Sequence, residues 1–229
     1  MSDGAEHIES STSPGFRDRL RGFGPLGLLA IVLVLLGVGV TPPIGALIVV
    51  LWMWLSKMPW RDIGYVKPKS WIATIVLGIA FGVALKIAMK AVVMPLLGAP
   101  PSNAAFHEIA ANTNALLEFA AYAVIGAGWG EETVFRGWLF ERLGKLFGES
   151  FVAKALIVIL GAALFGVAHW QQGLPGIEQA TIVGFLFGAI FMSTGRLIPL
   201  MFAHAAFDIT AALMIFTGTE SQFSHLVFK

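Results

Sequence analysis

The chain has 229 residues, of which 57% are hydrophobic and only 13% are charged. Soluble domains carry about 25% charged residues, so this composition excludes an ordinary soluble protein. The formal net charge of +1 excludes a broadly basic nucleic-acid-binding surface, and the absence of cysteine excludes disulfides and thiolate chemistry.

The N-terminal 22 residues are polar, rich in serine and end in a short basic segment. We expect residues 1–22 to form a flexible tail. The apolar run at about 23–40 predicts a first membrane span, because a spanning helix needs about 20 mostly apolar residues. No small-residue cleavage site precedes the turn at Thr41, Pro42 and Pro43, so we expect this span to be retained rather than removed as a signal peptide.

Further apolar runs continue toward the C-terminus. In hydrocarbon every backbone amide must be paired, so apolar runs of this length must be helices. Residues 138–149 instead alternate apolar and charged residues at helical spacing, which is typical of an interfacial amphipathic helix. The sequence therefore predicts an all-α polytopic membrane protein, a bundle of about seven (six to eight) transmembrane helices. The spans after the first are expected at about 44–57, 70–94, 115 onward, 152–170, 177–194 and 197–217.

Basic residues lie mostly in alternate connections of the expected bundle. Besides the N-terminal tail, the 57–69 loop, the 142–154 segment and Arg196 hold most of the lysines and arginines. This distribution predicts a cytoplasmic N-terminus, because basic loops stay on the cytoplasmic side. Lys86 and Lys90 fall inside a span, and we expect their ammonium groups to reach the membrane surface. The alternative is that they face the cavity of the bundle.

Six further ionisable residues lie inside apolar sequence. Each costs several kcal/mol at membrane depth, and such residues usually persist because function requires them. The remaining histidines, His7, His107 and His225, lie in a tail, a loop and the C-terminal end, and no role is expected of them. The six residues are Glu131, Glu132, Arg136, His169, His204 and Asp208.

The two neighbouring glutamates are expected to have different roles. Glu132 and Arg136 are four residues apart with the acid first, which is the favourable order for an ion pair on one helix face. Glu131 lies about 100° around the helix from Glu132 and should therefore point elsewhere, into the bundle. Glu132 and Arg136 thus form a supporting pair, and a purely structural role for this pair is the alternative.

Each intramembrane histidine has a neighbour one turn away. His204 shares a helix face with Asp208, and Phe165 can pack over the ring of His169. Counted linearly, His169 lies near the outer end of its span, whereas His204 lies about two turns from the inner end of another. A site that contains both histidines therefore requires offset, kinked or tilted helices. The alternative is that each histidine simply bonds a carbonyl group of another helix.

A carboxylate and two imidazoles in an apolar cavity support two kinds of hydrolysis. They can bind a divalent metal such as zinc, which accepts histidine and carboxylate ligands and keeps one position for water. The metal ligands would then be Glu131, His169 and His204. Alternatively, Glu131 with His169 activates water directly as a general base. His204 with Asp208 would in that case stabilise the oxyanion, and the sequence leaves both mechanisms open.

Three short motifs occur in order within the C-terminal half of the chain. They are Glu131-Glu132-x-x-x-Arg136, Phe165-x-x-x-His169 and His204-x-x-x-Asp208. Their order and spacing resemble the EExxxR, FxxxH and HxxxN/D motifs of the CPBP intramembrane proteases. That family includes CAAX prenyl endopeptidases and bacteriocin-processing or immunity proteins. The organisation then expected is a tail at 1–22, three transmembrane helices with loops at 23–114, motif-bearing catalytic helices at 115–217 and a short tail at 218–229.

The resemblance implies a membrane-integral endopeptidase that hydrolyses peptide bonds of membrane-associated substrates. By the same resemblance Glu131, His169 and His204 are the essential groups, and Asp208 stands where many relatives have asparagine. The expected partners are the lipid bilayer and a peptide or membrane-protein substrate, without nucleic acid. The expected location is the bacterial cytoplasmic (inner) membrane. The alternatives are a transporter or proton-coupled carrier that uses the same buried residues, and a catalytically silent immunity or scaffold relative.

Overall fold

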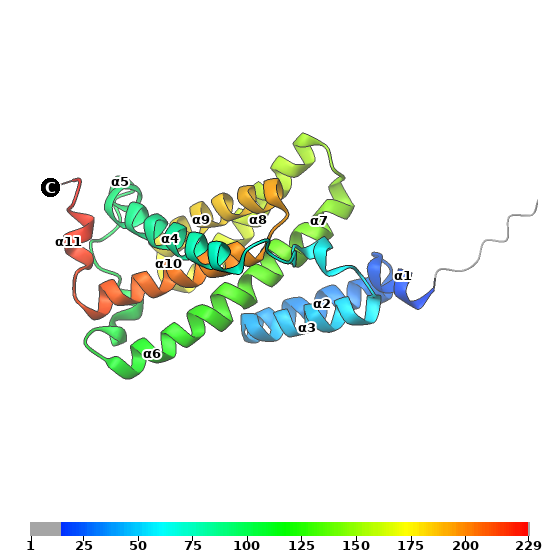
Figure 1. The fold of residues 1–229 in the computed structure, drawn as a ribbon, viewed down its shortest axis with the longest axis horizontal. Helices are drawn as coiled ribbons and strands as arrows, with labels where there is room; N and C mark the ends of the chain where they lie inside the picture. Colours follow the sequence, from blue (N-terminus) through cyan, green and yellow to red (C-terminus); the bar gives the residue numbers. More distant parts are fainter. Residues whose placement is uncertain (1–14, 229) are drawn as a thin grey trace, which may run out of the picture.

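A computed structural model describes residues 15–228, and every regular element among them is a helix (Figure 1). This confirms the predicted all-α fold. Residues 1–14, which include His7 and most of the predicted tail, lie outside the described residues. The α-helices are α1 (Phe16–Arg21), α2 (Pro25–Val40), α3 (Pro42–Ser56), α4 (Trp71–Ala88), α5 (Met94–Leu96), α6 (Thr113–Tyr122), α7 (Leu139–Phe147), α8 (Phe151–Ala168), α9 (Gly173–Thr194), α10 (Ile198–Phe216) and α11 (Glu220–Ser224).

Shorter segments of other helix types join these elements. Two are π-helical, η2 (Met89–Val93) between α4 and α5 and η4 (Ala123–Trp138) between α6 and α7. Three are 3₁₀ turns: η1 (Trp60–Ile63), η3 (Ala104–Ile109) and η5 (Trp170–Gln172). Because η4 joins α6 and α7 without a break, one long helix carries the whole Glu-Glu-Arg motif.

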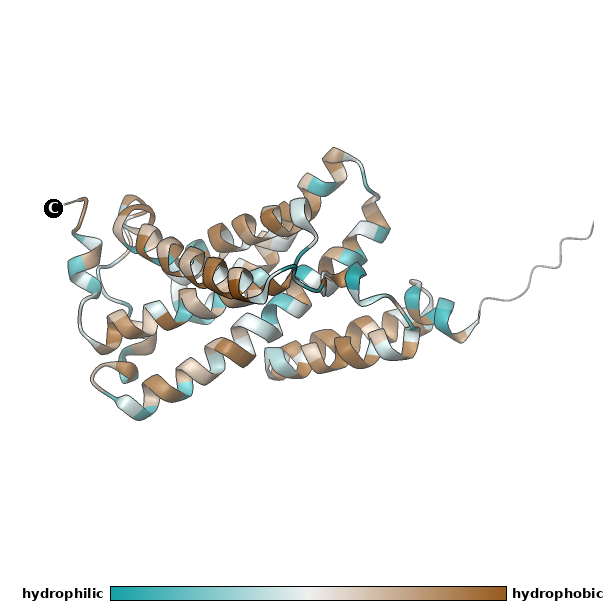
Figure 2. Cartoon of the chain, viewed as in Figure 1, coloured by the Kyte–Doolittle hydropathy of each residue, from teal (hydrophilic) through white to brown (hydrophobic). Residues whose placement is uncertain are grey.

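Four helical stretches in the described chain are long and apolar enough to cross a membrane. α2 and α3 are also apolar but have only 16 and 15 residues, and the helix through η4 is not among the four stretches. Figure 2 shows hydrophobic residues along the helices and hydrophilic residues gathered around α1 and in the loops. The polytopic membrane fold is thereby confirmed. The four stretches are Trp71–Leu96, Phe151–Ala168, Trp170–Thr194 and Ile198–Phe216.

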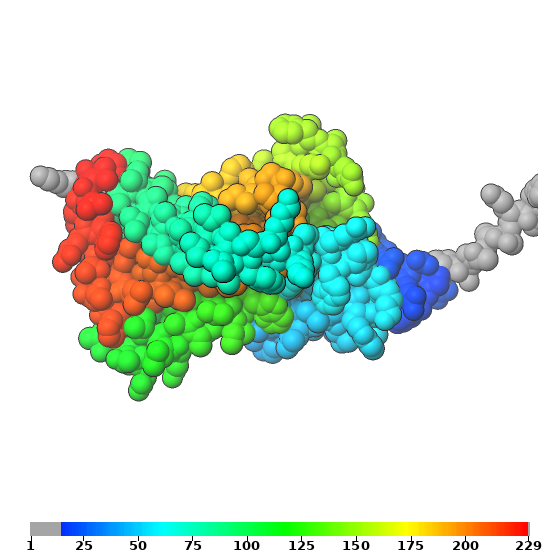
Figure 3. All heavy atoms as spheres, in the orientation of Figure 1, coloured from blue at the N-terminus to red at the C-terminus, as the bar shows by residue number. Residues whose placement is uncertain are grey.

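The bundle is organised around α10. This helix packs against α4, η4 and α6, while α8 pairs with α9 and α3 lies against η4. The space-filling view shows α4 lying along α10 on one face of the molecule (Figure 3). In Figure 1, α1 lies at one end of the molecule and α11 at the other.

Glycines four residues apart predict close helix packing in lipid, and α4 confirms this prediction. A Cβ atom added to Gly82 would lie 2.0 Å from the carbonyl oxygen of Ala203 on α10, and one added to Gly78 would lie 2.8 Å from that of Pro199. Both glycines therefore allow the backbones of α4 and α10 to approach. This contact fixes the depth of α10, which carries His204 and Asp208.

We expect Gly82→Ala to destabilise the fold by about 1–3 kcal/mol, because the added methyl group overlaps a backbone atom that cannot move alone. Gly39→Ala in α2 is the matched control, since a Cβ at Gly39 meets nothing within 4 Å. Unfolding by SDS measures the stability of both detergent-solubilised variants. Equal stability of the two variants would contradict the close approach of α4 and α10.

Two predictions about the periphery are wrong. Helix α1 forms within the segment predicted as a flexible tail, because its end is bonded to α3: Trp52 Nε1 donates to the Leu20 carbonyl at 3.0 Å and Arg21 Nε donates to the Ser56 carbonyl at 2.9 Å. Lys86 and Lys90 do not reach the membrane surface but are buried in the protein.

Candidate active site

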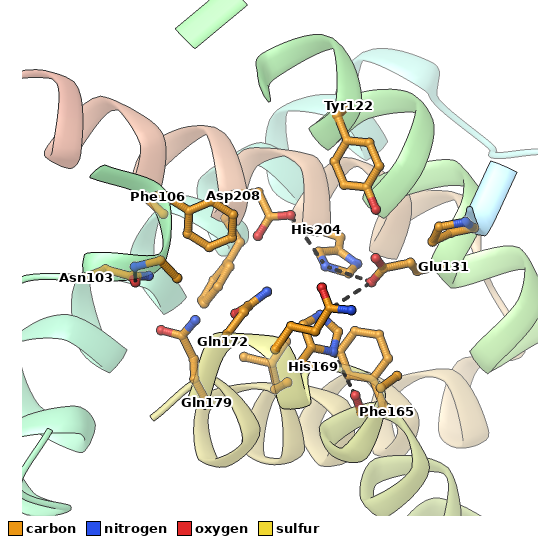
Figure 4. A pocket seen from close by; sticks show the side chains of 18 of the residues that line it. Asn103, Phe106, Tyr122, Glu131, Phe165, His169, Gln172, Gln179, His204 and Asp208 are labelled. Carbon is orange, nitrogen blue, oxygen red and sulfur yellow. Dashed lines mark hydrogen bonds and ion pairs between the residues drawn. The ribbon is translucent and has the colours of Figure 1, made fainter. Parts of the chain in front are cut away.

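A cavity of about 800 Å³ lies between the helices that carry the three motifs. This volume is within the range of about 300–1,000 Å³ that is typical of ligand pockets. Its wall contains the four predicted catalytic residues together with side chains that the sequence did not single out (Figure 4). The four are Glu131, His169, His204 and Asp208.

The two glutamates lie in the middle of η4. At its C-terminal end the backbone N–H of Leu139 donates to the carbonyl of Val134, five residues earlier, as in a π-helix. π-helical turns are rare and are frequent at functional sites. Gly128 lets the segment approach α10, since a Cβ there would lie 2.7 Å from the Met201 carbonyl oxygen. The segment therefore presents both acids to the interior, and both are buried.

Glu131 brings the two intramembrane histidines together. Its Oε2 atom lies 3.9 Å from Nε2 of His169 and 3.9 Å from Nε2 of His204 (Figure 4). The same oxygen is buried and has no hydrogen-bond partner among the described residues. Three polar atoms from η4, the end of α8 and α10 thus surround one point that no protein atom fills.

Glu132 points away from this point, as the helical spacing predicted. Its Oε1 atom lies 3.0 Å from Nη1 of Arg136, which confirms the predicted ion pair, although Nη1 is not aligned for a hydrogen bond. The guanidinium also stacks over the ring of Phe165 at 4.0 Å from its centroid. The same Oε1 atom accepts a hydrogen bond of 2.7 Å from Nδ1 of His204. This second contact was missed, because nothing in the sequence connects residues 72 positions apart.

The hydrogen bonds of the histidines fix which ring nitrogen faces Glu131. His169 Nδ1 lies 2.7 Å from the Phe165 carbonyl oxygen, and His204 Nδ1 lies 2.7 Å from a Glu132 carboxylate oxygen. Both oxygens are acceptors, so each Nδ1 carries the hydrogen and donates it. In the neutral rings, each Nε2 is therefore an acceptor that faces another acceptor, Glu131. Only a donor between them, such as water or a cation, satisfies this arrangement.

Asp208 lies on the same side of His204 as Glu131. Its Oδ2 atom is 3.8 Å from His204 Nε2, and its side chain is 24% exposed toward the cavity. The carboxylate that orients His204 through Nδ1 is therefore Glu132, not Asp208. Asp208 instead lies where a substrate can reach it.

The difference in depth between the two histidines is resolved by an offset of the helices. His169 caps the C-terminal end of α8, and His204 lies in the second turn of α10. Because both rings approach one oxygen of Glu131, the end of α8 must lie beside the start of α10. The ring of Phe165 lies 4.6 Å from that of His169, centroid to centroid, and is tilted by 56°, which confirms the predicted packing of the two rings.

Tyr65, in the loop before α4, supports η4 from outside the membrane-spanning segments. Its hydroxyl lies 2.7 Å from Oγ1 of Thr133, the residue after Glu132, and Thr133 donates to the Trp129 carbonyl. Burial raises the pKa of Tyr65 above its usual value, so the phenol keeps its proton at neutral pH. No pattern in the sequence predicts this contact.

Glu131, His169 and His204 are residues of the types that bind zinc, but their polar atoms lie further apart than the ligands of a zinc ion. Zinc holds nitrogen and oxygen ligands at about 2.0–2.2 Å, which sets neighbouring donors about 3.4 Å apart. Glu131 lies 3.9 Å from each histidine, and in residues 15–228 no group of three histidine, aspartate or glutamate side chains is arranged to hold a metal ion. Zinc binding by Glu131, His169 and His204 would need the side chains to move closer. Polar atoms at the observed spacing are typically bridged by water.

The fold and the site define a polytopic membrane protein with a buried carboxylate–histidine cluster, as in an intramembrane hydrolase. Residues 113–210 match the family model described as Rce1-like, type II CAAX prenyl endopeptidase Rce1-like. This motif-bearing part of the chain is therefore similar to a family of membrane CAAX proteases, which confirms the resemblance drawn from the three motifs. No curated protein and no solved structure matches the chain.

Proposed function

We propose that this protein is an intramembrane endopeptidase in which Glu131 activates a water molecule for attack on a peptide bond. One observation carries this proposal: the buried Oε2 atom of Glu131 has no partner and faces Nε2 of both His169 and His204 at 3.9 Å. A water molecule in this position can donate to two of the three acceptors. Glu132 does not take the same role, because its side chain does not line the cavity and its Oε1 atom is held by Arg136 and His204.

The reaction then uses the cavity residues in order. Glu131 accepts a proton from the water as its oxygen bonds to the carbonyl carbon of the substrate. His204, when protonated, donates to the resulting oxyanion, and Glu132 and Asp208 balance its charge. The C–N bond then breaks, and the proton held by Glu131 passes to the departing amine. His169, fixed by the Phe165 carbonyl, positions the water.

We further propose that the protein lies in the bacterial cytoplasmic membrane with its N-terminus in the cytoplasm. The alternation of basic and non-basic connections supports this orientation. Substrates are peptides or membrane proteins that reach the cavity from the bilayer. A transporter would be expected to have two similar halves with broken helices, and the described helices do not divide in this way.

We expect the purified protein, reconstituted in lipid vesicles, to cleave membrane-associated peptides in the presence of a zinc chelator as fast as without it. The physical reason is that Glu131 lies 3.9 Å from each histidine, which is further than the about 3.4 Å between neighbouring zinc ligands, so that water is the bridging group we propose. Mass spectrometry of the products locates the cleaved bond. A pH-sensitive dye inside the same vesicles reports any proton flux.

Two results would contradict this expectation in different ways. Cleavage that is lost with chelator and restored by added zinc would assign Glu131, His169 and His204 as metal ligands and replace water activation by the protein alone. A proton flux without any peptide cleavage would favour the carrier alternative instead.

A further inference from the structure

Lys86 is a buried cation in the wall of the same cavity. It lies in the last turns of α4, its residue is only 7% exposed, and its ammonium group lies 4.8 Å from the centroid of the Phe207 ring. Its hydrogen bond is to Gln179 on α9, whose Oε1 atom accepts from Nζ at 3.0 Å. Neither residue belongs to any of the three motifs.

The charge of Lys86 lacks a close counter-ion. Within the described chain no carboxylate oxygen lies within 4.0 Å of its Nζ atom, although Asp208 lines the same cavity. Lys90, one turn further along the helix, differs in this respect, because its Nζ atom lies 3.0 Å from Oε1 of Glu220. A cation at membrane depth without a close carboxylate is costly, and such residues usually persist where function requires them.

The surroundings of Lys86 fit a carboxylate. The ammonium group has three hydrogens, and only one is used by Gln179. The Oε1 atom of Gln179 is occupied by this bond, which leaves its amide N–H groups as donors at the cavity wall. Two neighbouring donor groups, one of them charged, match the two oxygens of a carboxylate.

We propose that Lys86, with Gln179, binds a carboxylate of the peptide substrate and so fixes which bond reaches Glu131. This inference rests on the proposed endopeptidase function. In Figure 4, Gln179 and Asp208 lie on one side of the two histidines and Glu131 on the other, so the substrate would extend across the cavity between the anchor and the water. Cleavage would then occur at a fixed distance from the bound carboxylate.

The test measures peptide binding to Glu131→Gln protein in detergent, where bound peptide stays uncleaved. One fluorescent apolar peptide is used in three forms: with a free C-terminal carboxylate, with a C-terminal amide, and with an amide after a terminal aspartate. We expect the plain amide to bind at least about tenfold more weakly than the free carboxylate, since it loses a charge-assisted hydrogen bond. Strong binding of the aspartate form would identify a side-chain carboxylate as an equally good ligand.

Substitution then assigns the effect to Lys86. In the Glu131→Gln protein, Lys86→Met should remove the preference for the carboxylate, and Lys86→Arg should keep part of it. Lys67→Met is the control, because it removes an exposed charge and should leave the preference unchanged. Equal binding of the carboxylate and the plain amide, no binding of any form, or a preference that survives Lys86→Met would overturn the proposal. Cleavage by the wild-type protein is measured separately, so its absence would contradict the proposed function and leave the binding result standing.

Discussion

Glu131→Gln should lower the rate of peptide cleavage by about 10²- to 10⁴-fold while leaving the protein folded, because the amide cannot accept the proton of the attacking water. The side chain keeps its size, and the carboxylate it replaces has no hydrogen-bond partner for its Oε2 atom among the described residues. We therefore expect little change in stability. Cleavage is measured with a membrane-associated peptide in vesicles, and folding by gel filtration and SDS unfolding.

The matched control for this substitution is Glu118→Gln. Glu118 lies on α6 of the same continuous helix but is exposed and does not line the cavity. It should keep full activity. His169→Ala removes the other group that positions the water and should also abolish cleavage. Full activity of Glu131→Gln or His169→Ala would rule out the proposed mechanism.

Arg136→Met should destabilise the protein by about 3–5 kcal/mol, because it leaves the carboxylate of Glu132 buried without its counter-ion. The side chains of Arg136 and Glu132 are only 2% and 0% exposed, so water cannot replace the lost partner. The substitution also removes the guanidinium that stacks on Phe165. SDS unfolding of the solubilised protein measures the loss of stability.

A double-mutant cycle separates the ion pair from the other contacts of Arg136. Glu132→Gln removes the charge and keeps an oxygen that accepts the hydrogen bond of His204. Combined with Arg136→Met it should recover part of the lost stability, since no unpaired charge then remains. Arg196→Met is the control for loss of an exposed arginine. A cost of Arg136→Met no larger than that of Arg196→Met would show that the pair contributes nothing to stability.

The parts of the fold that follow from local rules could be predicted from the sequence. The apolar runs predicted the helices, because a backbone in hydrocarbon must pair all its polar groups, and a single segment can do this only as a helix. The four-residue spacing gave the pair of Glu132 and Arg136 and the stacking of Phe165 on His169, because residues one turn apart share a face. Whether the gathered residues are catalytic stays a prediction.

What could not be predicted depends on contacts between distant segments. The bond from His204 to Glu132 joins α10 to η4, and its formation depends on the position of α10 along η4. Lys86 seemed a peripheral lysine because its neighbours in sequence are apolar, and only packing of α4 against α9 and α10 places its charge at the cavity. A hydropathy pattern gives the length of each helix but not its displacement relative to its neighbours.

The short helices α2 and α3 have a consequence for the surrounding lipid. With 16 and 15 residues they are about 24 Å and about 22 Å long, whereas the hydrocarbon core of a bilayer is about 30 Å thick. A bilayer responds to such hydrophobic mismatch by becoming thinner around the short segment. Because α3 lies against η4, this thinning occurs beside the helix that carries Glu131. On that flank headgroups and interfacial water come closer to the depth of the cavity.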